Sequence, residues 1–108
     1  MPLASLKILD FTRVLSGPYC TSLLAQIGAD IIKIEPPNGD DYRHIGPFIE
    51  GHKSALFETV NRGKRSLVLD LGRQEDRAVA IKLGAQADVV VEILGRGWRI
   101  NWGLGLRL

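Results

Sequence analysis

Residues 6–34 read LKILDFTRVLSGPYCTSLLAQIGADIIKI, and this stretch decides the fold. The apolar run at residues 6–11 is typical of a buried strand. Pro18 lies where proline favours the first turn of a helix, and Gly28 provides a residue that can end that helix in the left-handed conformation. A second apolar run follows at residues 31–34. The stretch therefore predicts a βαβ unit, with two parallel strands joined by a right-handed crossover.

The predicted helix between these strands has one apolar face. Its members recur at i, i+3, i+4 and i+7, and they are Cys20, Leu23, Leu24 and Ile27. This spacing predicts that the face packs on the sheet. Cys20 is then expected to be a small buried hydrophobe rather than a reactive thiol.

The second half of the chain repeats the same pattern. Residues 67–70 predict a third strand, and residues 73–87 predict a helix with Val79 and Leu83 on its apolar face. Residues 89–91 predict a fourth strand, whereas residues 36–62 are rich in turn residues and predict an irregular connection. Two βαβ units in succession predict an α/β fold with a Rossmann-like parallel sheet.

Composition excludes several classes of protein. The 108 residues carry 14 Lys and Arg against 12 Asp and Glu, a net charge of +2 that is far from the dense basic surface of a nucleic-acid binder. The single cysteine permits no internal disulfide and suits a reducing, cytoplasmic location. The sequence shows no signal peptide and no apolar run long enough to span a membrane. Neither glycine-rich nucleotide motifs nor metal-ligand spacings occur, so no metal or bound cofactor is expected.

Four blocks carry a resemblance to a known family. They are residues 6–34, EPP with GDDYR at residues 35–43, NRGKRSLVLDL at residues 61–71 and ADVVVE at residues 87–92. In this order and at these separations they resemble the start of the class III CoA-transferases. That family includes formyl-CoA and carnitine CoA-transferases and also α-methylacyl-CoA racemases. The resemblance covers residues 6–92 and implies the N-terminal, CoA-binding, Rossmann-like segment of a larger two-domain enzyme.

The resemblance also implies which residues contact coenzyme A. The positions that match the family's CoA-contacting stretches are Val14, Leu15, Ser16, Lys64, Arg65, Leu69, Asp70, Leu71 and Gly72. The first three follow the first strand, where ligands of parallel sheets gather. Asp70 is alternatively a plain strand-end acid, and Lys64 with Arg65 is alternatively a solvated basic turn. Leu15 and Pro36 replace polar or basic residues that some family members use near the ligand.

The implied reaction transfers CoA from an acyl-CoA to a carboxylic acid. In the family an aspartate attacks the thioester and forms a covalent intermediate. That aspartate follows the region matched here, so no catalytic residue is assigned and the chain alone is expected to be inactive. The resemblance implies a homodimer for the full-length protein. Two alternatives stay open, a racemase-type enzyme and a non-catalytic module that binds CoA or protein.

The segment at residues 93–108 departs from the family. It contains three arginines, both tryptophans and no acid. Back-translation with suitably chosen codons and one base added before Ile93 gives Asn-Phe-Arg-Pro-Gly-Val-Glu-Asp-Lys-Leu-Gly, the pattern that the family has there. The Leu-Gly of this pattern follows from Asn101, Trp102 and Gly103 whatever codons are used. The segment is therefore interpreted as a frameshifted tail. The alternative is a genuine divergent tail that contacts a membrane or an acidic partner.

Nucleotide sequencing across the codons of Glu92 and Ile93 tests the frameshift. We expect the frame displaced by one base to continue open well beyond the codon of Leu108 and to encode the family's aspartate. Early stop codons in that frame would contradict the interpretation and leave the tail as a genuine one.

Overall fold

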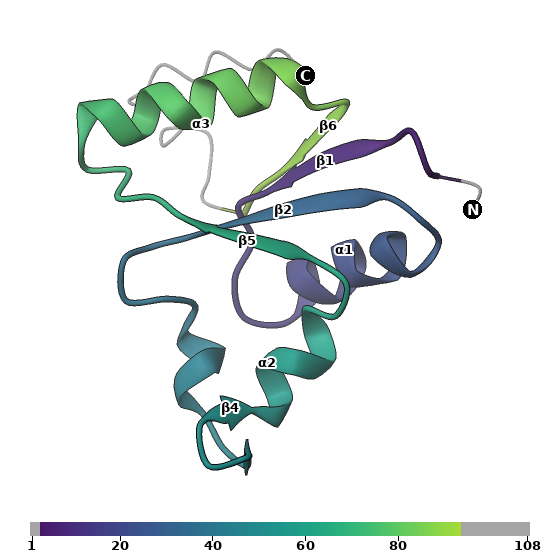
Figure 1. Cartoon of the computed structure of the whole chain (residues 1–108), viewed down its shortest axis with the longest axis vertical. Helices are drawn as coiled ribbons and strands as arrows, with labels where there is room; N and C mark the ends of the chain where they lie inside the picture. The colour runs from purple at the N-terminus through teal and green to yellow at the C-terminus, as the bar shows by residue number, and fades with distance from the viewer. Residues whose placement is uncertain (1–2, 94–108) are drawn as a thin grey trace.

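The computed structural model describes residues 3–93 of the chain, and its core is a four-stranded parallel sheet with the strand order β5-β2-β1-β6. The strands are β1 (Lys7–Asp10), β2 (Asp30–Glu35), β5 (Arg65–Val68) and β6 (Val89–Val91). Helices cover both faces of this sheet (Figure 1). The α/β fold with a parallel sheet is thus confirmed.

The first βαβ unit has the predicted connectivity. β1 pairs in parallel with β2 from Lys7 opposite Asp30 to Asp10 opposite Lys33. Helix α1 (Ser16–Gln26) connects the two strands. The backbone at Gly28 has a φ of 108°, the left-handed conformation that was predicted to follow the helix.

The second unit reaches across the whole sheet. Helix α3 (Gln74–Gln86) connects β5 to β6, but these strands lie at opposite edges, β5 beside β2 and β6 beside β1. α3 therefore packs across the two central strands. Its contact surface is an apolar cluster on one face of the sheet, whose buried members are Leu9, Phe11, Ile34, Leu69 and Ala80.

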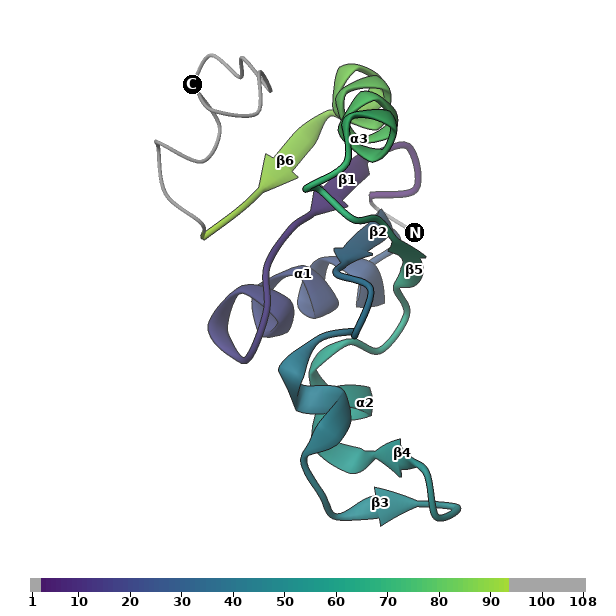
Figure 2. The same ribbon diagram turned by 90° about the vertical axis from the view of Figure 1, so that its left-hand side faces the viewer.

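Helix α1 covers the face of the sheet opposite α3 (Figure 2), and the packing on this face differs. A smaller apolar cluster of Ile8, Ala29 and Ile31 lies under one end of α1. Toward the carboxyl ends of the strands, α1 instead presents Thr21 and Ser22, which are 0% and 1% exposed.

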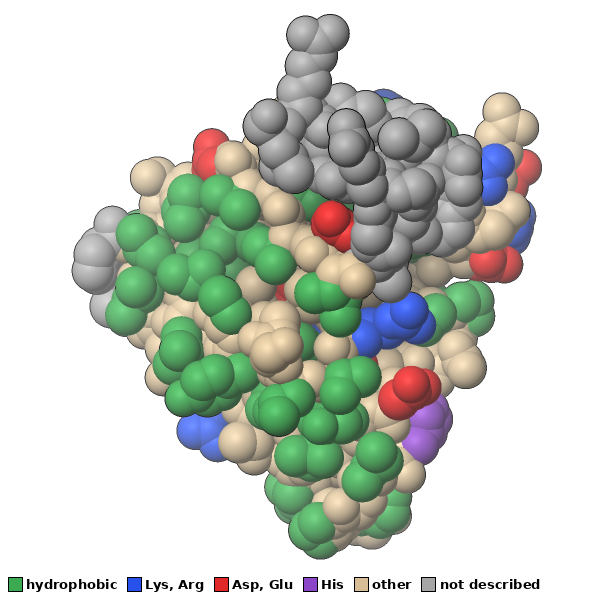
Figure 3. Space-filling model, turned by 180° about the vertical axis from the view of Figure 1, so that it is seen from behind, with side chains coloured by type: hydrophobic (Ala, Val, Ile, Leu, Met, Phe, Trp, Pro, Cys, Tyr) green, Lys and Arg blue, Asp and Glu red, His purple; other side chains and the backbone are tan. Residues whose placement is uncertain are grey.

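The predicted buried face of α1 is therefore wrong in part. Cys20 is exposed, and Leu23 and Ile27 are 45% and 44% exposed. The physical reason is that the sheet below α1 carries buried charges, so the helix turns its hydroxyl groups inward to meet them. Hydrophobic side chains consequently spread over the outer surface on the α1 side, which Figure 3 views directly.

The connection predicted as irregular contains short elements. They are the 3-10 helix η1 (Asp41–His44), a hairpin of β3 (Phe48–Ile49) and β4 (Lys53–Ser54), and helix α2 (Ala55–Val60). The Ser54 side chain accepts a hydrogen bond from the Phe57 amide at 3.2 Å and caps α2. A serine directly before the Ala-Leu-Phe-Glu run is the N-cap signal from which this helix could have been predicted.

A buried carboxylate fastens this connection to the sheet. Glu35, at the end of β2, is 1% exposed. Its carboxylate accepts hydrogen bonds from Arg43 at 2.6 and 2.7 Å, from the Asp40 amide at 3.0 Å and from the Ser66 hydroxyl. The Arg43 guanidinium also lies over the Phe57 ring, 3.8 Å from its centroid. Burial alone would raise the pKa of Glu35, but hydrogen bonds from Arg43, Ser66 and the Asp40 amide outweigh burial and lower that pKa from 4.5 to about 2.

Two further points concern the predicted absence of a membrane span and the tail. No helix within residues 3–93 is long and apolar enough to cross a membrane. The proposed tail at residues 93–108 lies outside the described residues apart from Ile93.

The lowered pKa of Glu35 predicts a loss of stability in acid. An unfolded chain takes up the proton near pH 4.5 and the folded chain only near pH 2, so folding is stabilised above pH 4.5 and the contribution is lost as the pH falls toward 2. Allowing for the solvent around the partly exposed Arg43, we expect a loss of about 2 kcal/mol in the free energy of unfolding.

Urea unfolding at pH 7, 4.5 and 3 measures this contribution. Arg43→Met should remove most of the acid dependence. Arg65→Met, which breaks the exposed Arg65–Asp30 pair, serves as the control and should keep it. Equal acid dependence in wild type and Arg43→Met would contradict the assignment to Glu35.

Candidate functional site

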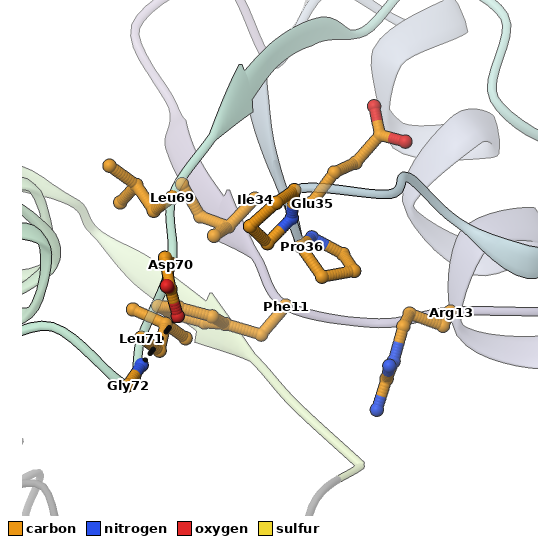
Figure 4. A pocket seen from close by; sticks show the side chains of 10 residues that line it. Phe11, Arg13, Ile34, Glu35, Pro36, Leu69, Asp70, Leu71 and Gly72 are labelled. Atoms are coloured by element: carbon orange, nitrogen blue, oxygen red, sulfur yellow. Dashed lines mark hydrogen bonds between the residues drawn. The ribbon is translucent and has the colours of Figure 1, made fainter.

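A hollow of about 320 Å³ opens at the carboxyl edge of the sheet. This is the edge where ligands of open parallel sheets bind. Its walls come from the residues that follow three strands, and they are Phe11, Arg13, Ile34, Glu35, Pro36, Pro37, Leu69, Asp70, Leu71 and Gly72. Most of these side chains are apolar (Figure 4). A space of this size and character accepts a flat, largely apolar group such as one end of a large cofactor.

Residues 69–72 form one wall and are held by α3. The Asp70 amide donates to the Asp76 carboxylate at 2.7 Å, and Arg77 donates to the Leu71 carbonyl at 3.1 Å. The Asp70 carboxylate in turn accepts from the Gly72 amide at 3.0 Å, the contact drawn in Figure 4. The four predicted residues Leu69, Asp70, Leu71 and Gly72 thus lie together in a fixed turn at the hollow.

The opposite wall combines proline rings with one cation. Pro36 and Pro37 follow β2 directly, and their rings give this wall an apolar surface. The Glu35 carboxylate points away from the hollow (Figure 4), toward its partners on the other face of the sheet. Arg13 lines the hollow and makes no hydrogen bond or ion pair with any other residue of the described part of the chain.

The loop between β1 and α1 adjoins the hollow through Arg13. The next three residues are the predicted contacts, the loop residues Val14 and Leu15 and the first residue of α1, Ser16, and all three are exposed. Val14 has a φ of 76°, in the left-handed region that a β-branched residue rarely occupies. Backbone strain of this kind is commonly found at ligand-binding sites. It persists only where the surrounding contacts enforce it.

The two predicted cations lie apart from the hollow. The Lys64 side chain is 2% exposed, and its ammonium lies 3.1 Å from the Asp10 carboxylate under the start of α1. Burial lowers the pKa of Lys64, although the nearby Asp10 opposes that effect. Arg65 stands at the beginning of β5 and pairs with Asp30 at 2.7 Å on the surface. Four of the nine predicted residues therefore line the hollow, three adjoin it and two lie elsewhere.

Sequence reasoning missed part of the site. Phe11, Arg13, Ile34 and Pro37 were not assigned as contacts, although each lies at or just after the end of a predicted strand, and Pro36 was noted only as the replacement of a basic residue. That position relative to the strands was the available signal. His44 and His52 bind only backbone carbonyls in the 36–62 connection. Within residues 3–93 no group of three or more His, Cys, Asp or Glu side chains is placed to hold a metal ion.

Comparisons with known proteins identify the family to which the chain is related. Residues 3–107 match the sequence model of CoA-transferase family III. The chain is 54% identical over 94 residues to a succinyl-CoA:mesaconate CoA-transferase of Haloarcula hispanica. The match covers 83% of this chain and 24% of that enzyme. It is 47% identical over 92 residues to an acetyl-CoA:oxalate CoA-transferase of Acetobacter aceti, covering 84% of this chain and 23% of that enzyme.

A solved structure shows the same fold. The crystal structure of a CaiB/BaiF family protein from Brucella suis superposes with a TM-score of 0.90 at 41% identity, over 98% of this chain and 29% of that protein. The chain thus spans about a quarter of the length of the curated relatives that it matches. With the family model matching nearly its whole length, the chain belongs to CoA-transferase family III.

Proposed function

We propose that this chain is the N-terminal part of a CoA-transferase and forms the wall that binds one end of an acyl-CoA. The observation that carries the proposal is the hollow at the carboxyl edge, with the fixed turn at residues 69–72 on one side and Arg13 on the other. An apolar slot bounded by the Arg13 guanidinium, which has no partner within residues 3–93, suits an adenine ring with a neighbouring phosphate. The exposed residues Val14, Leu15 and Ser16, at the end of the loop and the start of α1, would extend this contact along the ligand.

The proposed reaction moves CoA from a thioester to a free acid. An aspartate carboxylate of the longer enzyme attacks the thioester carbonyl, which expels the CoA thiolate and leaves a mixed anhydride. The thiolate then attacks the aspartyl carbonyl, which releases the donor acid and forms an aspartyl-CoA thioester. The acceptor carboxylate attacks that thioester next, and the same two steps in reverse order give the new acyl-CoA and restore the aspartate.

The nucleophile is proposed to lie outside this chain. A nucleophilic carboxylate must reach a bound thioester, whereas Asp10 and Asp40 are 0% exposed and are paired with Lys64 and Lys33. The relatives described above are named as transferases, which favours transfer over the racemase alternative. Mesaconate and oxalate are both dicarboxylic acids, so we propose a dicarboxylic acid as the acceptor of the full-length enzyme. A homodimer of that enzyme remains part of the proposal.

Coenzyme A binding by the purified 108-residue chain tests the site. Calorimetry should give a Kd of roughly 1 µM or weaker, about −8 kcal/mol or less favourable, because this chain holds only part of the family's pocket. Arg13→Met should weaken CoA about tenfold, the effect of losing one charge-assisted contact to phosphate.

Lys82→Met is the matched control for that variant. Lys82 is exposed on α3, so the substitution removes the same charge away from the hollow and should leave the Kd unchanged. Equal weakening by both variants would show only a general attraction of anions. No binding of CoA by the wild-type chain would overturn the proposed site.

The isolated chain should catalyse no transfer. We expect the exchange of CoA between succinyl-CoA and mesaconate, or between acetyl-CoA and oxalate, to proceed no faster with the chain than in buffer. Chromatography of the thioesters measures this directly. Exchange that disappears in Asp70→Asn, the variant of the one aspartate that lines the hollow, would contradict the proposal and place a nucleophile within this chain.

A further inference from the structure

The β1–α1 loop holds an unfavourable backbone conformation at Val14. Val14 has a φ of 76°, and residues Val14 and Leu15 are 41% and 50% exposed. A strained residue keeps its conformation only when the structure around it enforces it. Within residues 3–93, buried contacts that can enforce it lie on either side of Val14, at the end of β1, at Thr12 and in the first turns of α1.

Asp10 makes contacts on both sides. One carboxylate oxygen accepts hydrogen bonds from the amide of Thr12, at 2.7 Å, and from its hydroxyl. The other oxygen accepts from the hydroxyl of Thr21 in α1 at 2.6 Å. All three residues are 0% exposed. A single buried carboxylate thus ties the start of the loop to the helix that follows it.

Lys64, which directly precedes β5, completes the connection. Its ammonium lies 3.1 Å from the second Asp10 oxygen and donates to the Pro18 carbonyl at 2.9 Å and to the Asn61 side chain at 2.8 Å. An ammonium has three hydrogens, so these three acceptors use its whole capacity. Lys64 therefore holds both the first turn of α1 and the Asp10 carboxylate in place.

Two more contacts leave the loop little freedom. Lys33 donates to the Thr12 carbonyl at 2.8 Å, which holds the residue before Arg13 from the side of β2. Gly17 packs so closely on Thr12 that an added Cβ would lie 2.4 Å from the Thr12 Cβ. Both ends of the segment from residue 13 to residue 16 are consequently fixed by buried groups.

We propose that Asp10, Lys64 and Thr21 are positioning residues, which hold the β1–α1 loop in the conformation that receives the acyl-CoA. This inference rests on the proposed function, because the ligand that it names is the one proposed above. A loop that is already ordered spends less free energy on ordering when the ligand binds. If the contacts are removed, the loop is correctly shaped only part of the time and the apparent affinity falls by that fraction.

The role makes the burial of Lys64 intelligible. The resemblance pointed to Lys64 as a direct CoA contact, but a side chain that is 2% exposed and fully hydrogen-bonded has no donor left for a phosphate. It acts through the loop instead. Asp10 also acts through the loop. Its carboxylate is surrounded by donors, and it would repel an anionic ligand if it faced one.

Two measurements on the 108-residue chain test the proposal, the NMR order parameter of the Val14 amide and the calorimetric Kd for CoA. In wild type the order parameter should be near 0.85, typical of rigid backbone, and in Lys64→Met it should fall below about 0.6. A loop that is competent about one tenth of the time would weaken CoA binding about tenfold.

A matched pair of variants at Thr21 separates positioning from general stability, and it keeps the test sharp if Lys64→Met does not fold. Thr21→Val keeps the size of the side chain and loses the hydroxyl, so it should loosen Val14 and weaken CoA about threefold. Thr21→Ser keeps the hydroxyl and loses a methyl group, so it should behave as wild type. Ile31→Val removes a methyl group from the core under α1 without touching the loop, and it should change neither measurement.

The outcomes separate the two proposals. An order parameter at Val14 that stays near the wild-type value in both Lys64→Met and Thr21→Val overturns the positioning role, whether or not CoA binds. A loosened loop with an unchanged Kd overturns it as well. A wild-type chain that binds no CoA overturns the proposed function. In that case, a lower order parameter at Val14 in Lys64→Met and Thr21→Val, but not in Thr21→Ser, still supports the role of these residues in holding the loop.

Discussion

The ion pair between Asp10 and Lys64 is the constraint on which the α1 side of the sheet depends. Both groups are buried between the sheet and α1, where an unpaired charge would cost several kcal/mol. Each charge must therefore be met by the other and by every donor or acceptor within reach. That requirement sets which side of α1 faces the sheet, how β1 passes into α1, and where the segment before β5 lies.

This requirement explains where sequence reasoning succeeded and where it failed. Strands β1, β2 and β6 and helices α1 and α3 could be predicted, because apolar runs and helical spacing report burial against a sheet. The inward face of α1 could not be predicted, because Leu23 and Ile27 have the spacing of a core face although they are exposed. A hydroxyl that faces a buried carboxylate gives no periodic signal, so the pattern alone could not reveal Thr21 as the contact.

The candidate site shows the same division. Leu69, Asp70, Leu71 and Gly72 were found through a resemblance to relatives, and the structure brings them to one turn beside the hollow. Arg13 and the proline pair could have been found from their place after a strand, without any relative. The neighbours of Lys64 could not, because Asp10 and Pro18 are 54 and 46 positions away in sequence and only the folded chain brings them to its ammonium.

The buried charges also give this chain a division between its two faces. The α3 face is an apolar core of the ordinary kind, and from it α3 holds the turn at residues 69–72 through Asp76 and Arg77. The α1 face uses Glu35 with Arg43 and Asp10 with Lys64, so its order depends on charges that are balanced within the chain. The hollow lies where the two kinds of packing meet. Its walls are thus fixed from both faces, which is the condition for a loop and a turn on different strands to present one surface to a ligand.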